Sequence, residues 1–173
     1  MNVKEAIEHR RSVREYQDKQ IPEDIINELL DAARKAPSAK NTQSHKYFVI
    51  KDKEIIAKLK EGESFKQPFV YQAPLIIVCC ANPKDYPESV DVDDTPENYS
   101  LVDLSIATSF MTLRATELGL GSVYIAWLYR DNIRKVLQIP DDYMIPYALA
   151  IGYPNPDEEK RIRPRKEVSE ILF

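Results

Sequence analysis

The sequence predicts an α+β fold, and three segments carry this prediction. Residues 75–81 form a continuous apolar run with the length of a buried strand. Residues 25–36 place apolar side chains at helical spacing, whereas residues 101–118 are apolar on nearly every side. Because helical and strand segments follow one another without a regular strand–helix–strand alternation, α+β is favoured over a parallel α/β sheet.

Length, charge and composition indicate one domain over residues 1–173. A chain of 20.0 kDa is long enough to bury a hydrophobic core. The net charge of -4 disfavours a general nucleic-acid-binding protein. The apolar run 75–81 is far too short for a membrane span, and residues 1–5 show no signal-peptide pattern. We therefore expect a cytoplasmic protein with neither nucleic acid nor membrane as partner.

The two cysteines are adjacent, at Cys79 and Cys80 on the expected strand. Successive strand residues point to opposite faces of a sheet, so a bond between these two is not expected. No His/Cys spacing suits a metal site.

The first half of the chain predicts two helices before its strands. A short helix is expected over residues 3–9. Pro22 opens the next helix, because a proline in the first turn loses no helical hydrogen bond, and Pro37 ends it. The remaining elements of this half are a polar loop over 37–44, a strand over 47–50, a helix over 53–61 and the strand over 75–81.

The second half is organised around one long helix. Ser100 and Asp103 have the spacing of a capping box, which predicts a helix from there to about Leu118. Its apolar character predicts burial by the sheet, by another helix or by another subunit. Residues 82–98 are rich in prolines and acids and are expected as a surface excursion. The aspartates of this excursion are Asp91, Asp93 and Asp94. Their spacing matches no calcium-binding loop, so a solvated acidic loop is favoured over a calcium site. A strand over 122–126, a helix over 132–137, a strand over 147–151 and a last segment over 168–173 follow.

Basic residues gather in two short clusters on an otherwise acidic chain. In the first, Arg10, Ser12 and Arg14 alternate, so in extended backbone they point to one side, with Arg11 and Val13 on the other. Guanidinium groups suit phosphate or carboxylate, so the pattern predicts a site for one local anionic ligand. A solvated basic turn remains the alternative. The second cluster lies at the far end of the chain: Lys160, Arg161, Arg163, Arg165 and Lys166.

Residues with acid, base or nucleophile chemistry are scarce. Neither His9 nor His45 has a nucleophile nearby in sequence, and Ser122 lacks the glycine pattern of a nucleophile elbow. The chain is therefore either not an enzyme or takes its chemistry from a bound cofactor.

Several blocks of the sequence, in order, resemble the FMN-dependent nitroreductase family. They cover nearly the whole chain: residues 10–16 (RRSVREY), residues 36–43 (APSAKNTQ), residues 117–122 (ELGLGS), residues 146–154 (PYALAIGYP) and the basic tail with Arg163 and Arg165. The resemblance implies a nitroreductase-like fold, with a central, mostly antiparallel sheet flanked by helices, in a homodimer whose subunits share the sites at their interface.

The resemblance also implies roles for individual residues toward FMN. Arg10, Arg11 and Ser12 match positions that hold the phosphate and ribityl chain, and Arg14 matches a cation at the pyrimidine end of the flavin. Arg163 and Arg165 match a pair that closes over the phosphate. The loop that reaches the flavin from the other subunit corresponds to Pro37, Ser38, Ala39, Asn41 and Gln43.

The residues expected near the substrate depart from the family pattern at several positions. The segment with Tyr124, Ala126 and Trp127 matches the strand that passes the reactive N5 edge, but the family often has glycine near Trp127. An indole there either covers the flavin face or belongs to the core. Gln67 lies roughly where the family has an Asn-Gln pair. Residues 44–45, Ser-His, stand where the family often has a proline followed by a tryptophan.

The activity implied is an FMN-dependent NAD(P)H oxidoreductase working by ping-pong exchange. Reduced nicotinamide would pass hydride to flavin N5, and a nitroaromatic, a quinone or a similar acceptor would then take the electrons. No protein residue would form a covalent bond. Other flavin chemistry on the same fold, namely dehalogenation or flavin cleavage, remains an alternative, as does a non-catalytic nucleotide- or RNA-binding module. The sequence does not separate NADH from NADPH.

Overall fold

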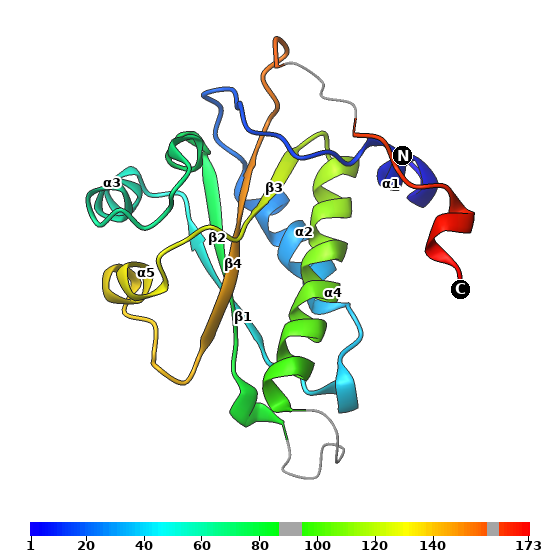
Figure 1. The fold of residues 1–173 in the computed structure, drawn as a ribbon. Coiled ribbons are helices and arrows are strands. Elements are labelled where there is room, and N and C mark those ends of the chain that lie inside the picture. Colours follow the sequence, from blue (N-terminus) through cyan, green and yellow to red (C-terminus); the bar gives the residue numbers. More distant parts are fainter. Residues whose placement is uncertain (87–94, 159–162) are drawn as a thin grey trace.

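The computed structural model describes residues 1–86, 95–158 and 163–173 of the chain, and the predicted acidic loop at Asp91, Asp93 and Asp94 lies outside them. Its centre is a four-stranded antiparallel sheet with strand order β1-β2-β4-β3, which confirms the α+β prediction (Figure 1). The strands are β1 (His45–Ile50), β2 (Leu75–Ala81), β3 (Gly121–Ile125) and β4 (Met144–Gly152).

Helices cover both faces of this sheet (Figure 1). On one face lie α2 (Glu23–Arg34) and the long α4 (Pro96–Glu117), and on the other lie α3 (Lys53–Glu61) and α5 (Arg130–Leu137). The short α1 (Val3–His9) packs against α4. No helix in the described part of the chain has the length and hydrophobicity needed to cross a membrane.

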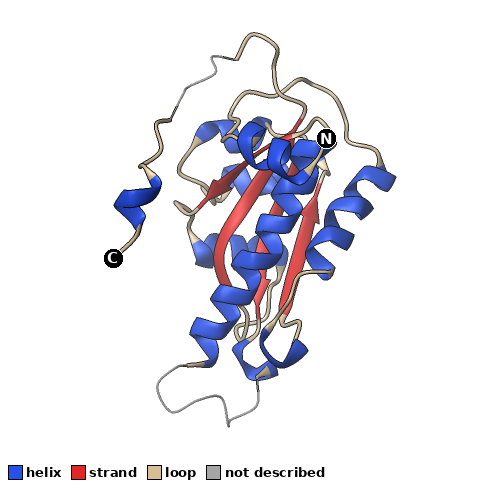
Figure 2. Cartoon of the chain, turned by 90° about the vertical axis from the view of Figure 1, so that its right-hand side faces the viewer, coloured by secondary structure: helices blue, strands red, loops and turns tan. Residues whose placement is uncertain are grey.

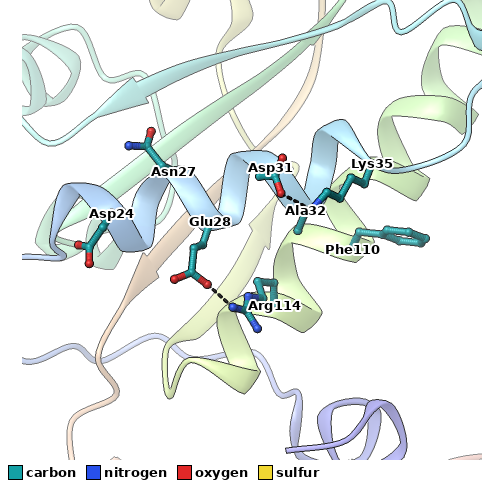
Figure 3. A pocket seen from close by; sticks show the side chains of 8 residues that line it. All are labelled: Asp24, Asn27, Glu28, Asp31, Ala32, Lys35, Phe110 and Arg114. Carbon is teal, nitrogen blue, oxygen red and sulfur yellow. Dashed lines mark hydrogen bonds and ion pairs between the residues drawn. The ribbon is translucent and has the colours of Figure 1, made fainter.

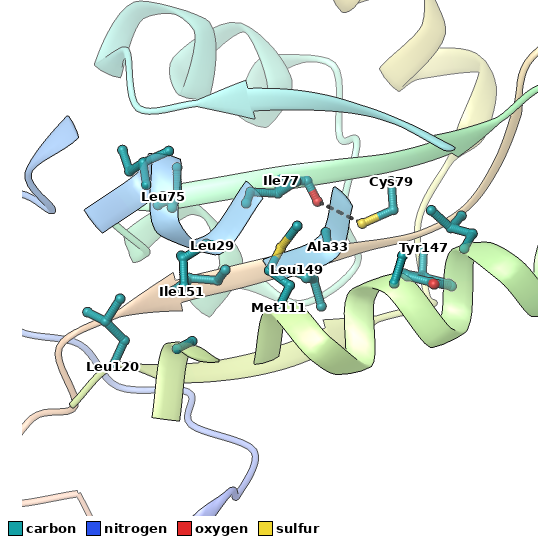
Figure 4. Packing of buried hydrophobic residues seen from close by; sticks show 14 of the residues in the cluster. Leu29, Ala33, Leu75, Ile77, Cys79, Met111, Leu120, Tyr147, Leu149 and Ile151 are labelled. Atoms are coloured by element: carbon teal, nitrogen blue, oxygen red, sulfur yellow. Dashed lines mark hydrogen bonds between the residues drawn. The ribbon is translucent and has the colours of Figure 1, made fainter. Parts of the chain in front are cut away.

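The apolar run 75–81 is the central strand β2, and it is buried along its whole length. Alternate residues therefore face two separate cores. Leu75, Ile77 and Cys79 pack toward α2 and α4 (Figure 4), whereas Ile76 and Cys80 face the core under α3 and α5. The prediction that Cys79 and Cys80 point to opposite faces without a disulfide is confirmed. Burial raises the pKa of the Cys80 thiol to about 12, so this side chain is unreactive at neutral pH.

Helix α4 begins earlier than the sequence predicts. Its N-cap is Thr95, whose side chain accepts a hydrogen bond from the Asn98 N–H, so the predicted capping box at Ser100 and Asp103 is wrong. Both of those residues lie buried inside the helix. The carboxylate of Asp103 binds other segments instead, as described below.

One side of α4 faces the core and the other remains uncovered. Leu104 and Met111 are fully buried against the sheet and α2. Leu101, Val102 and Phe110 keep 39%, 54% and 43% of their surface exposed, so large apolar side chains stand on the outer side. The sequence predicted that this helix is buried on several sides. Within one chain, only its inner side is buried.

The C-terminal segment, residues 163–173, extends away from the body and ends in the 3₁₀ helix η4 (Val168–Ile171), which stands clear of it (Figure 2). Its apolar side chains have little contact with the remainder of the chain. Val168, Ile171 and Leu172 are 69%, 69% and 68% exposed.

Candidate functional site

The arginine segment, residues 10–16, lies along the start of β3. Ser12 forms a parallel bridge with Ser122, and the Val13 N–H donates to the Ser122 carbonyl oxygen at 3.2 Å. The Val13 side chain is 2% exposed and packs over Gly121. The segment is therefore extended, as the alternation of its side chains predicted, and joined to the edge of the sheet.

A second set of bonds joins the same segment to the chain that leaves β4. The Gln17 N–H donates to the Tyr153 carbonyl at 2.9 Å, and the Asn155 N–H donates to the Glu15 carbonyl at 3.0 Å. The Tyr16 hydroxyl donates to the Val13 carbonyl at 2.7 Å and lies 3.1 Å from the Ala150 carbonyl oxygen, so it joins the two segments. Burial raises the pKa of the Tyr16 phenol, so it stays a neutral donor. Tyr16 belongs to the predicted motif, but its anchoring role depends on β4, which sequence reasoning did not place beside it.

Arg11 and Arg14 both contact Glu158, a residue that the sequence analysis did not single out. The Arg11 Nη1 lies 2.5 Å from Glu158 Oε2, and the Arg14 N–H donates to Glu158 Oε1 at 2.7 Å. The Arg14 guanidinium donates to the Ser12 carbonyl at 3.3 Å. Glu158 is 147 positions from Arg11 in the sequence, so no local pattern indicates that the two residues are in contact.

The guanidinium groups of three arginines have no hydrogen bond or ion pair to any residue that the structure describes: Arg10, Arg163 and Arg165. Every other described arginine binds a carboxylate or a backbone carbonyl. Guanidinium groups without acidic partners keep all their N–H donors available to an anion. All three belong to the set for which the resemblance implies contact with phosphate, and the fourth arginine of that set, Arg11, is paired with Glu158. The expected neighbours Lys160 and Arg161 lie outside the described residues.

The loop from Pro37 to Gln43 has an unusual backbone. Lys40, Asn41 and Gln43 adopt positive φ angles of 53°, 56° and 53°, which are uncommon for residues other than glycine. Within the loop, the Gln43 N–H donates to Ser38 Oγ at 3.1 Å. The loop thus has a defined conformation that its neighbours must hold in place.

A buried carboxylate anchors this loop to α4. Asp103 Oδ2 accepts from the Ala39 N–H at 2.9 Å and from the Tyr86 hydroxyl, and it is 4% exposed. Ser44 Oγ donates in turn to the Tyr86 hydroxyl at 3.2 Å. Burial and the hydrogen bond to Asp103 raise the pKa of the Tyr86 phenol to about 12. Next to this cluster, His45 is the first residue of β1, which begins two residues before the predicted strand 47–50, and burial lowers the pKa of His45 although Asp103 opposes the shift.

The end of β3 presents aromatic side chains to solvent. Tyr124 is 38% exposed and Trp127 is 61% exposed, so Trp127 is not a core residue. Ala126 is exposed between them. The Lys66 ammonium lies 5.9 Å from the centre of the indole ring, and the Lys66 N–H donates to the Trp127 carbonyl at 3.2 Å. The adjacent Gln67 has a buried side-chain oxygen without a hydrogen-bond partner.

Besides the residues at the end of β3, the predicted site residues form two groups in one chain, and the tail arginines lie on the separate C-terminal segment. The arginine segment lies beside β3, just after the C-terminal end of α4, whereas Ala39 is bound at Asp103 near its N-terminal end. At 1.5 Å per residue, the helix from Asp103 to Glu117 separates these ends by about 20 Å. One chain therefore does not bring loop 37–43 to its own arginine segment.

A shallow hollow between α2 and α4 contains none of the predicted site residues (Figure 3). An ion pair between Glu28 and Arg114 lies across it, and the exposed ring of Phe110 stands at its edge. Acidic residues of α2 line the other side, including Asp24 and Asp31. Its charge does not suit a phosphate-bearing ligand.

Comparisons with known proteins agree on one family. The sequence model of the nitroreductase family matches residues 7–64 and 58–153. A relative from Archaeoglobus fulgidus, named as an NADH dehydrogenase/NAD(P)H nitroreductase, is 34% identical over 154 residues, covering 87% of this chain and 84% of the relative. A relative from Methanothermobacter thermautotrophicus with the same name is 35% identical over 161 residues, covering 89% of this chain and 78% of that protein.

Solved structures show the same relationship. A nitroreductase family protein from Clostridium difficile superimposes with a TM-score of 0.85 at 31% identity, covering 100% of this chain and 98% of that one. An FMN-dependent nitroreductase from the same species has a TM-score of 0.79 at 29% identity, with 97% and 96% of the two chains covered.

Proposed function

Since this chain belongs to the nitroreductase family and is an oxidoreductase, we propose that it is an FMN-dependent NAD(P)H oxidoreductase acting as one domain. The observation that carries the proposal is the set of arginines without partners. Arg10 ends α1, two residues before the bridge between Ser12 and Ser122, and Arg163 and Arg165 lie on the free C-terminal segment. A phosphate dianion supplies the charge that these three guanidinium groups lack.

Other predicted site residues fit the rest of FMN. Gln67 has a buried oxygen that needs a donor, which the N–H of a flavin ring provides. The guanidinium of Arg14 makes one long hydrogen bond and retains further donors for the pyrimidine end. Ser12 lies between Arg10 and Arg14 in the sequence and is partly exposed. These groups match the phosphate, the ribityl chain and the polar edge of the ring.

FMN supplies the redox chemistry when bound, by taking hydride from a reduced nicotinamide and passing electrons to a second compound. The protein orients the reactants and stabilises charge. The guanidinium of Arg14 would supply a fixed positive charge to stabilise the negative charge of the reduced flavin. The exposed indole of Trp127 offers a flat apolar surface to an aromatic acceptor, and the nearby Lys66 favours an acceptor with negative character. Nitroaromatics and quinones have these properties.

The site is completed by a second copy of the chain. Loop 37–43 is fixed about 20 Å along α4 from the arginine segment, so its expected contact with flavin is to that of a partner. The exposed apolar residues of α4 provide an interface, and the free C-terminal segment provides a means of bringing Arg163 and Arg165 to a site shared by two subunits. We propose a homodimer with two equivalent sites.

Binding measurements test this function directly. Apo-protein titrated with FMN should quench flavin fluorescence, and anaerobic NADH or NADPH should bleach the bound flavin. Replacing Arg10→Ala should weaken FMN binding about tenfold or more, because a charge-assisted contact to phosphate is lost. The matched control is Arg34→Ala, since Arg34 pairs with Asp31 on the surface of α2. Absence of FMN binding by the wild-type protein would overturn the proposal.

A further inference from the structure

Glu158 makes an unusual set of contacts with the arginine segment. Its Oε2 binds the Arg11 guanidinium at 2.5 Å, and its Oε1 accepts from the Arg14 N–H at 2.7 Å and from the Glu15 N–H at 3.4 Å. The carboxylate side chain is 8% exposed and that of Arg11 is 28% exposed. One buried carboxylate thus satisfies a guanidinium and two backbone donors of the same segment.

The segment that carries Glu158 is itself fixed in position. The Glu158 N–H donates to the Asn155 carbonyl at 3.0 Å, which closes a turn. The Asn155 N–H donates to the Glu15 carbonyl at 3.0 Å, and Pro154 bridges Tyr16. These bonds hold the turn that leads to Glu158 against the arginine segment, so the carboxylate has a defined place.

Two neighbouring arginines differ in whether they have an acidic partner. Arg11 has an acidic partner within the chain, whereas Arg10 has none among the described residues. Breaking a buried pair leaves the remaining charge without compensation, so Arg11 is not readily released to bind another anion. The interpretation of Arg10 and Arg11 as equivalent phosphate ligands does not follow from this geometry.

We propose that Glu158 is a positioning residue for the phosphate site and that Arg11 is its tether rather than a phosphate ligand. Glu158 holds the backbone at Arg14 and keeps Arg11 occupied, so that Arg10 and Ser12 present a fixed arrangement to the cofactor phosphate. This inference rests on the proposed FMN function. It concerns residues of this chain alone and does not require the dimer.

The opposite reading makes the opposite prediction. If Arg11 bound phosphate and Glu158 competed with it, removing the negative charge of Glu158 would free Arg11 and tighten FMN binding. If Glu158 positions the segment, the same change loosens the backbone and weakens FMN binding. The sign of the change in affinity therefore decides between them.

The experiment compares FMN with riboflavin, which lacks the phosphate, on apo-protein by fluorescence quenching. Glu158→Gln and Arg11→Met should each weaken FMN binding about tenfold and leave riboflavin binding unchanged. The double variant should be no weaker than either single variant, because both changes break one contact. Asp31→Asn, which breaks a surface pair with Arg34 and Lys35, is the control and should change neither affinity.

Two results of the FMN and riboflavin titrations would contradict the inference. Tighter FMN binding by Glu158→Gln overturns the inference, and so does a ratio of FMN to riboflavin affinity equal to that of wild type. Thermal unfolding of the apo-protein shows whether the variant folds. If Glu158→Gln does not fold, Glu158→Asp is judged by the same ratio, since it keeps the charge and shortens the reach. Failure of the wild-type protein to bind FMN contradicts the proposed function instead.

Discussion

The side chain of Val13 lies directly over Gly121, in the space that a Cβ atom at that position would occupy. A methyl group on Gly121 would collide with three side-chain carbons of Val13, which is itself buried. The close approach of the arginine segment to β3 therefore depends on a glycine. The same contact aligns Ser12 with Ser122.

Gly121→Ala should displace the arginine segment from the sheet. We expect a loss of about 1–3 kcal/mol in the free energy of unfolding, as for other overpacked sites, together with weaker FMN binding. Urea denaturation and flavin titration measure the two effects. The double variant Val13→Ala, Gly121→Ala removes the colliding carbons and should recover part of both losses. If the single variant equals wild type in both measurements, the contact does not position the segment.

Phe110→Asp should weaken the proposed dimer. Phe110 is 43% exposed on the outer side of α4, so the change adds a charge to the expected interface without opening the core. Sedimentation velocity should show a shift from dimer to monomer at micromolar concentration. Val49→Asp adds the same charge at an exposed position of β1 and should leave the dimer intact. A dimer unaffected by Phe110→Asp would place the interface elsewhere.

Tyr86→Phe should loosen loop 37–43. The change removes a donor from the buried Asp103 carboxylate, at a cost of about 1–3 kcal/mol in the free energy of unfolding. Tyr99 stacks on Tyr86 with ring centres 6.0 Å apart, so Tyr99→Phe is a control for changes to the aromatic pair. Denaturant unfolding compares the two variants. Equal stability of Tyr86→Phe and wild type would mean that Ala39 alone satisfies Asp103.

The half-buried His45 should make stability depend on pH. Burial lowers its pKa below the usual value of about 6.5, so folding favours the neutral ring. Its contribution is complete above the unfolded-state pKa and is lost as the pH falls through the folded-state value. Between about pH 7 and pH 5, wild type should therefore lose more unfolding free energy than His45→Gln. His9→Gln, at an exposed ring, should follow wild type. Parallel curves for all three proteins would contradict this prediction.

Trp127→Ala should change acceptor use more than cofactor binding. Loss of the exposed indole surface should raise the KM for an aromatic acceptor about three- to tenfold, while the Kd for FMN stays within about twofold. Steady-state kinetics with a nitroaromatic, beside a small non-aromatic acceptor as control, measures this. A lower KM would show that the indole obstructs the acceptor instead of binding it.

Most elements of the fold could be predicted because local patterns specify them. Strand 75–81 and helix 53–61 match the structure at both ends. An uninterrupted apolar run specifies the strand, and Gly62 ends the helix, and both are local signals. The start of α4 was predicted wrongly. Asp103 resembles a capping residue in sequence, but its partners Ala39 and Tyr86 lie 64 and 17 positions away.

Local sequence patterns specify the α+β class, the two faces of β2 and the two clusters of arginines, because periodicity and residue chemistry act over a few neighbouring positions. Tertiary structure alone decided that Arg11 pairs with Glu158, that Val13 lies over Gly121 and that loop 37–43 is far from its own arginine segment. These relationships arise when the closing of the sheet brings distant segments together. Their energies depend on burial and distance, which no local pattern encodes.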